Sequence, residues 1–291
     1  MDPKSQAVIE GAILVARRTR ADAVILATVL PEGARILRET LDDQCRIITA
    51  TPFDHSGAIR ADIERITLPE VRLRRRGRAK VALLEGLAAG LLNPGERVII
   101  VSGDESDGAE LDTIAVVEIE NDAEFLDSVG DASLAILQRV AEPAVFDTVL
   151  GLCVQLGREG KEGRPVGLLI TLGAADQVLE RSNPIVLNPF QGHPQEELSI
   201  LDPAVRRAIR EFSGMDGAFV LEADGTVVAA GRYLQESAPE DAVPTGLGAR
   251  HRAAAGITAA TGCIAFVVSE STGDTRVFGG GHLLMTIQRT D

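Results

Sequence analysis

The hydrophobic positions in the first half of the chain alternate between helical spacing and short continuous runs. Residues 5–20 have an apolar side at helical spacing, and Ser5 is the expected cap of this helix. The continuous apolar run Ala23–Val29 has the length of a strand covered on both faces. Further helices are expected from Pro31 and over 79–92, and further strands over 46–50, 97–102 and 113–119. This alternation predicts an α/β unit with a mostly parallel sheet and helices on both sides.

The second half has shorter apolar runs separated by polar turns. Helices are expected over 145–156 and 201–213, the second capped by Asp202 with Pro203 in its first turn. Strands are expected over 165–172, 218–222, 226–230, 263–269 and 276–278. The Pro-, Asn- and Gly-rich stretch 182–195 is expected to be loop. Helices mixed with short hairpins predict a central mixed sheet flanked by helices.

A length of 291 residues predicts two domains, each able to bury its own core. A charged stretch and one expected helix (131–141) precede Pro143, so the boundary is placed there. The expected domains are 1–125 and 145–291, joined by a linker helix within 126–144. No apolar run has the length of a membrane span and no secretory signal opens the chain, so a cytoplasmic location is expected.

Composition narrows the function classes. The net charge of −14 argues against a general nucleic-acid binder, because attraction to phosphate backbones requires a basic surface. Neither DNA nor membrane is therefore expected as a partner. The three cysteines, Cys45, Cys153 and Cys263, lie in apolar stretches without metal-ligand spacing. They are interpreted as small buried hydrophobes.

The segment from Gly246 to Gly262, GLGARHRAAAGITAATG, places Arg250, His251 and Arg252 in or beside the first turn of an expected helix. Cations there oppose the helix macrodipole at a cost of about 0.3–1 kcal/mol each. Free N–H groups, two guanidinium groups and an imidazole together suit a phosphate. A solvated basic loop is the alternative interpretation, and the unfavourable placement of the charges favours an anion site.

Two further polar segments border expected strands. Asp216-Gly217-Ala218 precedes one strand, and Ser269-Glu270-Ser271 ends another. Taken alone, each is typical of a turn. A carboxylate beside small residues also lets a metal–phosphate unit approach the backbone. The run Gly279-Gly280-Gly281 lacks the setting of a nucleotide loop and is interpreted as a turn.

In combination, these segments resemble a known family. DGA, GRYL (231–234), RHRAA (250–254) and VSESTG (268–273), in this order, resemble the diadenylate cyclase (DAC) domain. The likeness covers roughly residues 145–285. Residues 5–120 resemble, by the order of their elements, the C-terminal domain of pyruvate kinases, which is often an effector-binding platform. The fusion of the two looks like the archaeal-type diadenylate cyclases.

The resemblance implies an enzyme that joins two ATP molecules into cyclic di-AMP and releases two pyrophosphates. It implies a divalent metal, Mn²⁺ or Mg²⁺, and self-association of DAC domains head to head, because each domain would hold one ATP. The implied catalytic residues are Asp216, Arg250, His251 and Arg252. The implied substrate-binding residues are Gly217, Ala218, Tyr233, Leu234, Gly248 and Ser269. The implied metal ligands are Asp216 and Glu270.

The chain departs from the family pattern at three positions. Many members have Thr where this chain has Ala249, and a second Glu where it has Ser271. Bacterial members often have an acidic residue at about Ala259. These differences keep a second hypothesis open, a catalytically weak or inactive sensor that binds adenine nucleotides. A third hypothesis is a regulatory module related to pyruvate kinase.

Overall fold

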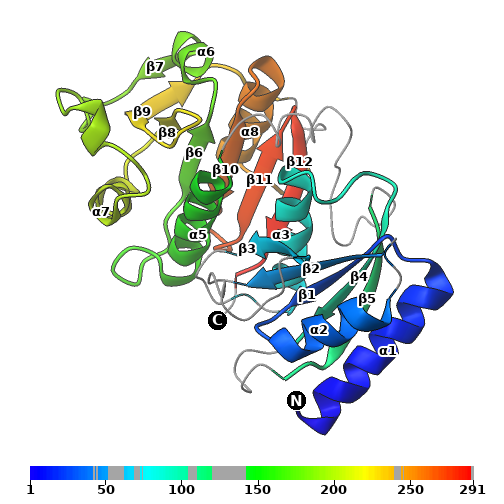
Figure 1. The fold of residues 1–291 in the computed structure, drawn as a ribbon. Helices are drawn as coiled ribbons and strands as arrows, with labels where there is room; N and C mark the ends of the chain where they lie inside the picture. Colours follow the sequence, from blue (N-terminus) through cyan, green and yellow to red (C-terminus); the bar gives the residue numbers. More distant parts are fainter. Residues whose placement is uncertain are drawn as a thin grey trace. The chain divides into compact units, whose positions relative to one another are not determined.

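The computed structural model describes residues 1–41, 43, 45–51, 62–68, 73, 75–103, 110–119, 142–238, 244 and 246–289. The chain divides into two units, Met1–Leu126 and Asp127–Asp291 (Figure 1). The helix expected over 131–141, and with it most of the expected linker, lies outside the described residues. Within the described part of the chain, no helix is long and apolar enough to cross a membrane.

The N-terminal unit is built on a five-stranded sheet of order β3-β2-β1-β4-β5. Its strands are β1 (Ala23–Ala27), β2 (Arg46–Thr51), β3 (Glu64–Thr67), β4 (Arg97–Ser102) and β5 (Thr113–Glu118). All neighbouring pairs are parallel except β4–β5. The prediction of a mostly parallel sheet is therefore confirmed.

Helices cover both faces of this sheet. On one face, α1 (Pro3–Thr19) and α2 (Pro31–Thr40) form one hydrophobic cluster with alternate strand residues such as Val24 and Leu26. Because successive strand residues point to opposite faces, Ile25 between them faces the other side. There α3 (Arg75–Ala88) packs against β1, β3 and β4. Figure 1 shows the two layers of helices on either side of the strands.

The C-terminal unit contains a seven-stranded mixed sheet of order β12-β11-β10-β6-β8-β9-β7. Its strands are β6 (Leu168–Leu172), β7 (Ser182–Pro184), β8 (Ala218–Leu221), β9 (Val227–Leu234), β10 (Ile264–Val268), β11 (Thr275–Gly279) and β12 (His282–Ile287). Only β6 and β8 pair in parallel; the other neighbours are antiparallel.

Two helices enclose the middle of this sheet. Helix α5 (Pro143–Glu159) lies on one face, where the ring of Phe146 packs 5.1 Å from that of Phe266 on β10. Helix α8 (Ala249–Ala260) lies on the other face, and its Ala254 clusters with the alternate residues Ala265 and Val267 of β10. The expected mixed sheet flanked by helices is confirmed. Shorter helical segments complete the unit: α6 (Ala175–Glu180), η2 (Gln195–Glu197) and α7 (Pro203–Phe212).

The structure corrects several local expectations. The first helix is capped by Asp2, whose carboxylate accepts from the backbone N–H of Ser5 at 2.8 Å, and not by Ser5 itself. The expected loop 182–195 begins with the short strand β7. Helix α5 starts at Pro143, inside the segment expected as linker. The cap of α7 by Asp202 and the burial of all three cysteines are confirmed.

Candidate active site

Chain direction brings the polar segments of the C-terminal unit to one edge of its sheet. The parallel strands β6 and β8 both begin at this edge. Strands β9 and β10 run antiparallel to them and therefore end there. Helix α8 also begins there, because β10 returns along the sheet after the helix has crossed it. Segments far apart in the sequence thus converge without any long loop reaching across the sheet.

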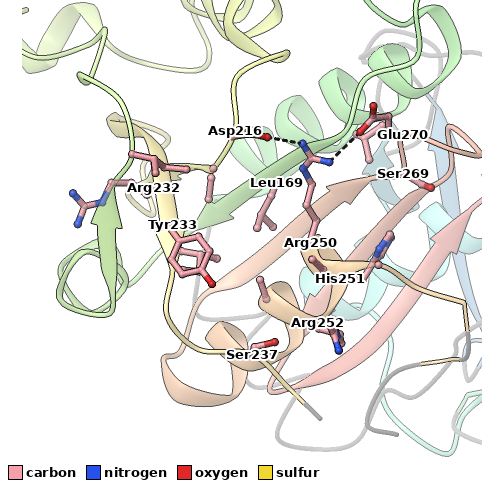
Figure 2. Close-up of a pocket in the computed structure, with 18 of the residues that line it drawn as sticks. Leu169, Asp216, Arg232, Tyr233, Ser237, Arg250, His251, Arg252, Ser269 and Glu270 are labelled. Atoms are coloured by element: carbon pink, nitrogen blue, oxygen red, sulfur yellow. Dashed lines mark hydrogen bonds and ion pairs between the residues drawn. The ribbon is translucent and has the colours of Figure 1, made fainter. Parts of the chain in front are cut away.

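A cavity of about 910 Å³ opens at this edge. Every site residue expected from the sequence lines it: Asp216, Gly217, Ala218, Tyr233, Leu234, Gly248, Arg250, His251, Arg252, Ser269 and Glu270. The structure thus brings the predicted residues into one hollow. Figure 2 shows labelled lining residues from β6, β9 and α8 and from the segments beside β8, β9 and β10.

The first turn of α8 forms one wall of the cavity. Gly248 is its N-cap and makes no side-chain capping bond, and no acidic residue occupies the first turn. Arg250, His251 and Arg252 fill that turn as the sequence predicts. The backbone N–H groups at a helix start and the positive end of its dipole attract anions. Together with the two guanidinium groups, this wall is suited to a polyphosphate.

Arg250 lies between two carboxylates. Its Nη1 donates to Glu270 Oε2 at 3.2 Å, and its Nη2 lies 3.6 Å from Asp216 Oδ1 (Figure 2). The Asp216 side chain is 89% exposed and that of Glu270 is 64% exposed. Such exposed pairs contribute about 0–1 kcal/mol, so a ligand or cation can separate them at little cost. The arrangement holds both carboxylates at one guanidinium.

The glycine in DGA allows β8 to begin close against β9. Gly217 has a φ of +95°, and a Cβ placed there would lie 2.7 Å from the backbone nitrogen of Arg232. Any L side chain would therefore be strained and would also collide with backbone. The close approach keeps Asp216 beside the end of β9, where Tyr233 and Leu234 line the cavity.

The opposite wall is largely apolar. Leu169, Ile185 and Leu234 line it together with the ring of Tyr233, which is 61% exposed. Arg232 points away from the cavity in Figure 2. It donates to the Ser182 hydroxyl at 3.0 Å and to the Leu179 carbonyl oxygen at 3.0 Å. These bonds tie β9 to β7 and to the end of α6, and so support the apolar wall.

His251 is the most enclosed of the three residues in the RHR segment, at 6% exposure. Burial, together with the charges of Arg276 and Arg250, lowers the pKa of its imidazole to about 4, and Asp274 opposes the shift. The ring is therefore neutral at pH 7. Its Nε2 lies 3.4 Å from Nη1 of Arg276 on β11, and its edge packs on Phe278 with ring centroids 6.2 Å apart.

The turn between β10 and β11 supplies the remaining polar groups. The Ser269 hydroxyl lies 3.2 Å from that of Ser271, and the backbone N–H of Thr272 donates to it at 3.4 Å. The segment is a hairpin turn, as one interpretation predicted, and it also lines the cavity. Among the residues that the structure describes, no group of three or more His, Cys, Asp or Glu could hold a metal ion by itself.

Sequence reasoning missed further residues of the site. Ser237, Ile185 and Leu169 line the cavity but belong to no motif, and the hydrogen bonds of Arg232 to Ser182 and Leu179 were not expected from GRYL. Arg276 and Asp274 contact the site only because β11 lies beneath α8, a tertiary relation that no local spacing shows. The available signal was the alternation along this segment. It places Asp274, just before β11, and Arg276, within β11, on the same face.

Comparison with known proteins finds matches to both halves of the chain. The family described as "DisA bacterial checkpoint controller nucleotide-binding" (DAC) matches residues 155–283, and the family described as "Probable sensor domain DacZ_P" matches residues 4–126. A diadenylate cyclase of Methanocaldococcus jannaschii is 35% identical over 202 residues, covering 69% of this chain and 63% of that protein. One of Haloferax volcanii is 42% identical over 147 residues, covering 50% of this chain and 54% of that protein. The chain thus spans less than two thirds of either relative's length.

Two solved structures match part of the chain. A hypothetical membrane-spanning protein from Bacillus cereus is 23% identical over 53% of this chain and 68% of its own, with a TM-score of 0.39. A double mutant of DacA from Staphylococcus aureus is 26% identical over 49% of this chain and 85% of its own, with a TM-score of 0.32. Residues 155–283 of the chain match the DAC domain family.

Proposed function

We propose that the protein is a diadenylate cyclase that condenses two ATP molecules into cyclic di-AMP and releases two pyrophosphates. The observation that carries the proposal is the single cavity that collects the DGA, RHR and Ser-Glu segments in a DAC-family domain. Relatives named diadenylate cyclase, at 35% and 42% identity, support it.

The two walls of the cavity would bind different parts of ATP. The apolar wall, with Tyr233 and Leu234, would hold the adenine. The first turn of α8, with Gly248 at its start, would hold the phosphates, and Ser269 would bond a phosphate oxygen. Gly217 and Ala218 would let the nucleotide lie close to the backbone. Holding the reactants in this way supplies much of the rate, because alignment replaces a bimolecular encounter.

The chemical step transfers a nucleotidyl group. The 3′-oxygen of one ATP forms a bond to the α-phosphorus of the other, and the bond to pyrophosphate breaks. Asp216 would help to remove the proton of the 3′-hydroxyl. Arg250 and Arg252 would stabilise the charge that develops on the phosphate and the leaving group. A second, equivalent transfer closes the ring.

A divalent cation fits the carboxylates of this site only with help from the nucleotide. Asp216 and Glu270 contact the same guanidinium, and no larger cluster of ligands lies among the described residues. Magnesium is commonly held by one or two carboxylates together with substrate phosphates. When bound, Mn²⁺ or Mg²⁺ would be held by these two side chains and would neutralise phosphate charge.

Self-association completes the proposal. One domain would hold one ATP, so two domains must face each other around a two-fold axis for the 3′-hydroxyl of each to meet the other's α-phosphate. The N-terminal unit, which matches a probable sensor domain, is proposed to adopt the fold of the pyruvate kinase C-terminal domain and to receive a signal.

The test is the formation of cyclic di-AMP from ATP with Mn²⁺ or Mg²⁺, followed by mass-resolved chromatography over a range of protein concentrations. We expect product from the wild type, a specific activity that falls on dilution, and at least a hundredfold loss in Asp216→Asn with ATP binding retained. Activity strictly proportional to concentration in a demonstrated monomer would contradict the facing domains. ATP binding without product, with either metal, would favour the nucleotide sensor and draw attention to Ala249 and Ser271.

A further inference from the structure

Residues on one face of β11 contact the His251 ring. Asp274, just before the strand, and Arg276 and Phe278 within it are alternate residues and point to the same side. Arg276 Nη1 lies 3.4 Å from His251 Nε2, and Phe278 packs on the ring edge. Arg276 and Asp274 do not line the cavity. Arg276 reaches it through His251, and the backbone carbonyl oxygen of Asp274 separately accepts from the N–H of the cavity residue Ser269 at 2.9 Å.

Arg276 is itself fixed from behind. Its Nη2 donates to Asp274 Oδ2 at 3.0 Å, and Asp274 Oδ1 accepts from the backbone N–H of Arg289 at 3.1 Å. The side chains of Arg276 and Asp274 are 13% and 16% exposed. A guanidinium held by a mostly buried carboxylate has little freedom to leave the imidazole.

This contact determines which nitrogen of His251 carries the proton. A guanidinium has donors and no acceptor, so Nε2 must accept from Arg276. In the neutral ring the proton then resides on Nδ1. The charged groups around the ring agree, since Arg276 and Arg250 disfavour the imidazolium and only Asp274 favours it. In the described part of the chain, Nδ1 is buried and meets no hydrogen-bond partner.

A buried donor without a partner is costly, and a ligand that supplies an acceptor recovers that cost. His251 lines the cavity on the side of the α8 N-terminus, where the proposed function places phosphate. We propose that Arg276, anchored by Asp274, is a positioning residue that turns Nε2 of His251 toward β11 and keeps Nδ1–H as the donor to a phosphate oxygen. This inference rests on the proposed function for the identity of the ligand.

The test compares Arg276→Met with a matched control. Imidazole ¹⁵N chemical shifts report the tautomer of His251, its signal identified by its loss in His251→Gln. Calorimetry with the α,β-methylene analogue of ATP and Mg²⁺ reports affinity without turnover. In Arg276→Met we expect the Nδ1–H tautomer to lose its dominance and the analogue to bind about tenfold more weakly, or about 1.4 kcal/mol.

Arg206→Met is the control, because Arg206 is likewise a partly buried arginine with fixed hydrogen-bond partners, the carbonyl oxygens of Ile200 and Leu201, but belongs to α7. It should leave the tautomer and the affinity unchanged. Should Arg276→Met not fold, Asp274→Asn keeps the guanidinium but loosens its anchor, and we expect the same changes at about threefold in affinity. An unchanged tautomer in the folded variants overturns the proposal, and so does a changed tautomer with unchanged affinity. Failure of the wild type to make cyclic di-AMP would refute only the proposed function, since neither readout depends on turnover.

Discussion

Arg46 and Arg97 in the N-terminal unit have different kinds of partner from Arg250 in the C-terminal unit. In the N-terminal unit, Arg46 begins β2 and donates to the Leu91 carbonyl oxygen and to Glu96. Arg97 begins β4 and donates to the Thr19 carbonyl oxygen and to Glu118. Each of these arginines thus joins a strand start to a neighbouring element by one fixed carbonyl and one carboxylate.

In the C-terminal unit, Arg250 has two carboxylate partners at its guanidinium, both lining the cavity and both more than half exposed. The comparison teaches that the partners, and not the residue type, distinguish a structural arginine from a binding one. A backbone carbonyl cannot be displaced without unfolding, whereas an exposed carboxylate can exchange its partner for a ligand.

The largest expected effect is a loss of activity, and it is tested by replacing one arginine in each unit. Arg250→Gln should lower kcat/KM for cyclic di-AMP synthesis at least a hundredfold, because it removes charge stabilisation at the phosphates. Its unfolding free energy should change by less than about 1 kcal/mol, because the ion pairs are exposed. Arg46→Gln should cost about 2 kcal/mol of stability, because it breaks hydrogen bonds from a charged donor to the Leu91 carbonyl oxygen and to Glu96, with catalysis retained. Chemical denaturation and initial rates measure both. Equal losses of activity in the two variants would invalidate the comparison.

A smaller effect tests how closely the chain packs at the cavity, using a helical glycine in each unit. A Cβ at Gly256 would lie 2.6 Å from the backbone nitrogen of Ser237, whereas one at Gly86 would meet the Leu92 side chain, which can move. Alanine normally favours a helix over glycine by about 0.5–1 kcal/mol. We expect Gly86→Ala to stay within about 1 kcal/mol of the wild type, and Gly256→Ala to lose about 2–3 kcal/mol through overpacking.

Gly256→Ala should also raise KM for ATP, because Ser237 lines the cavity and Ala238 donates to the Arg252 carbonyl oxygen at 3.0 Å. Thermal unfolding and steady-state kinetics give the two readouts. A Gly256→Ala protein as stable as the wild type would show that segment 236–238 does not press on α8 as described.

The smallest expected effect is the loss of folding stability as the pH falls. The pKa of His251 is lowered from 6.5 to about 4, so the unfolded chain binds its proton first and acid favours unfolding between these pH values. Such a shift corresponds to about 3 kcal/mol at most, and after solvent screening we expect about 1–2 kcal/mol. Denaturation of the wild type and of His251→Gln from pH 7 to pH 4 measures this difference, which should disappear in the variant.

Glu96 in the N-terminal unit provides the contrast. Burial raises the pKa of its carboxyl, but hydrogen bonds from Asn93 and Arg46 outweigh this and lower it below 4.5. Its contribution to stability is therefore present above pH 4.5 and is lost only as the pH falls through the lowered pKa. Glu96→Gln should leave the pH dependence between 6.5 and 4.5 unchanged. A changed pH dependence of stability between pH 6.5 and 4.5 in Glu96→Gln would show that the N-terminal unit, and not His251 alone, causes the acid response.

The sequence predicted most of what depends on local pattern. The RHR segment in a first helical turn follows from Gly248 and the alanines after it, and Asp202 caps α7 because a short carboxylate before Pro203 suits that position. Strand β3 was missed, because only one of its four residues, Ile66, is apolar and the strand lies within a charged stretch. Helix α6 was missed because six residues hold too little of the helical period.

Relations between elements could not be predicted from local pattern. The contact of Arg276 with His251 joins residues 25 positions apart in the sequence and exists only because β11 lies under α8. The fixing of Arg232 by Ser182 spans 50 positions and depends on the pairing of β7 with β9. Each of these side chains is ordinary in its own segment, and its role appears only when the sheet is assembled.

The return of the chain along α8 and β10 has a consequence for how such sites vary among relatives. The segment from Gly248 to Glu270 starts and finishes at the same edge of the sheet, and it carries Arg250 and Arg252 together with the Ser269-Glu270 pair. The segment is continuous and its two ends lie at the same sheet edge. Replacing this one segment in a related protein would therefore change the RHR and Ser-Glu residues together and leave the apolar wall of the cavity unchanged.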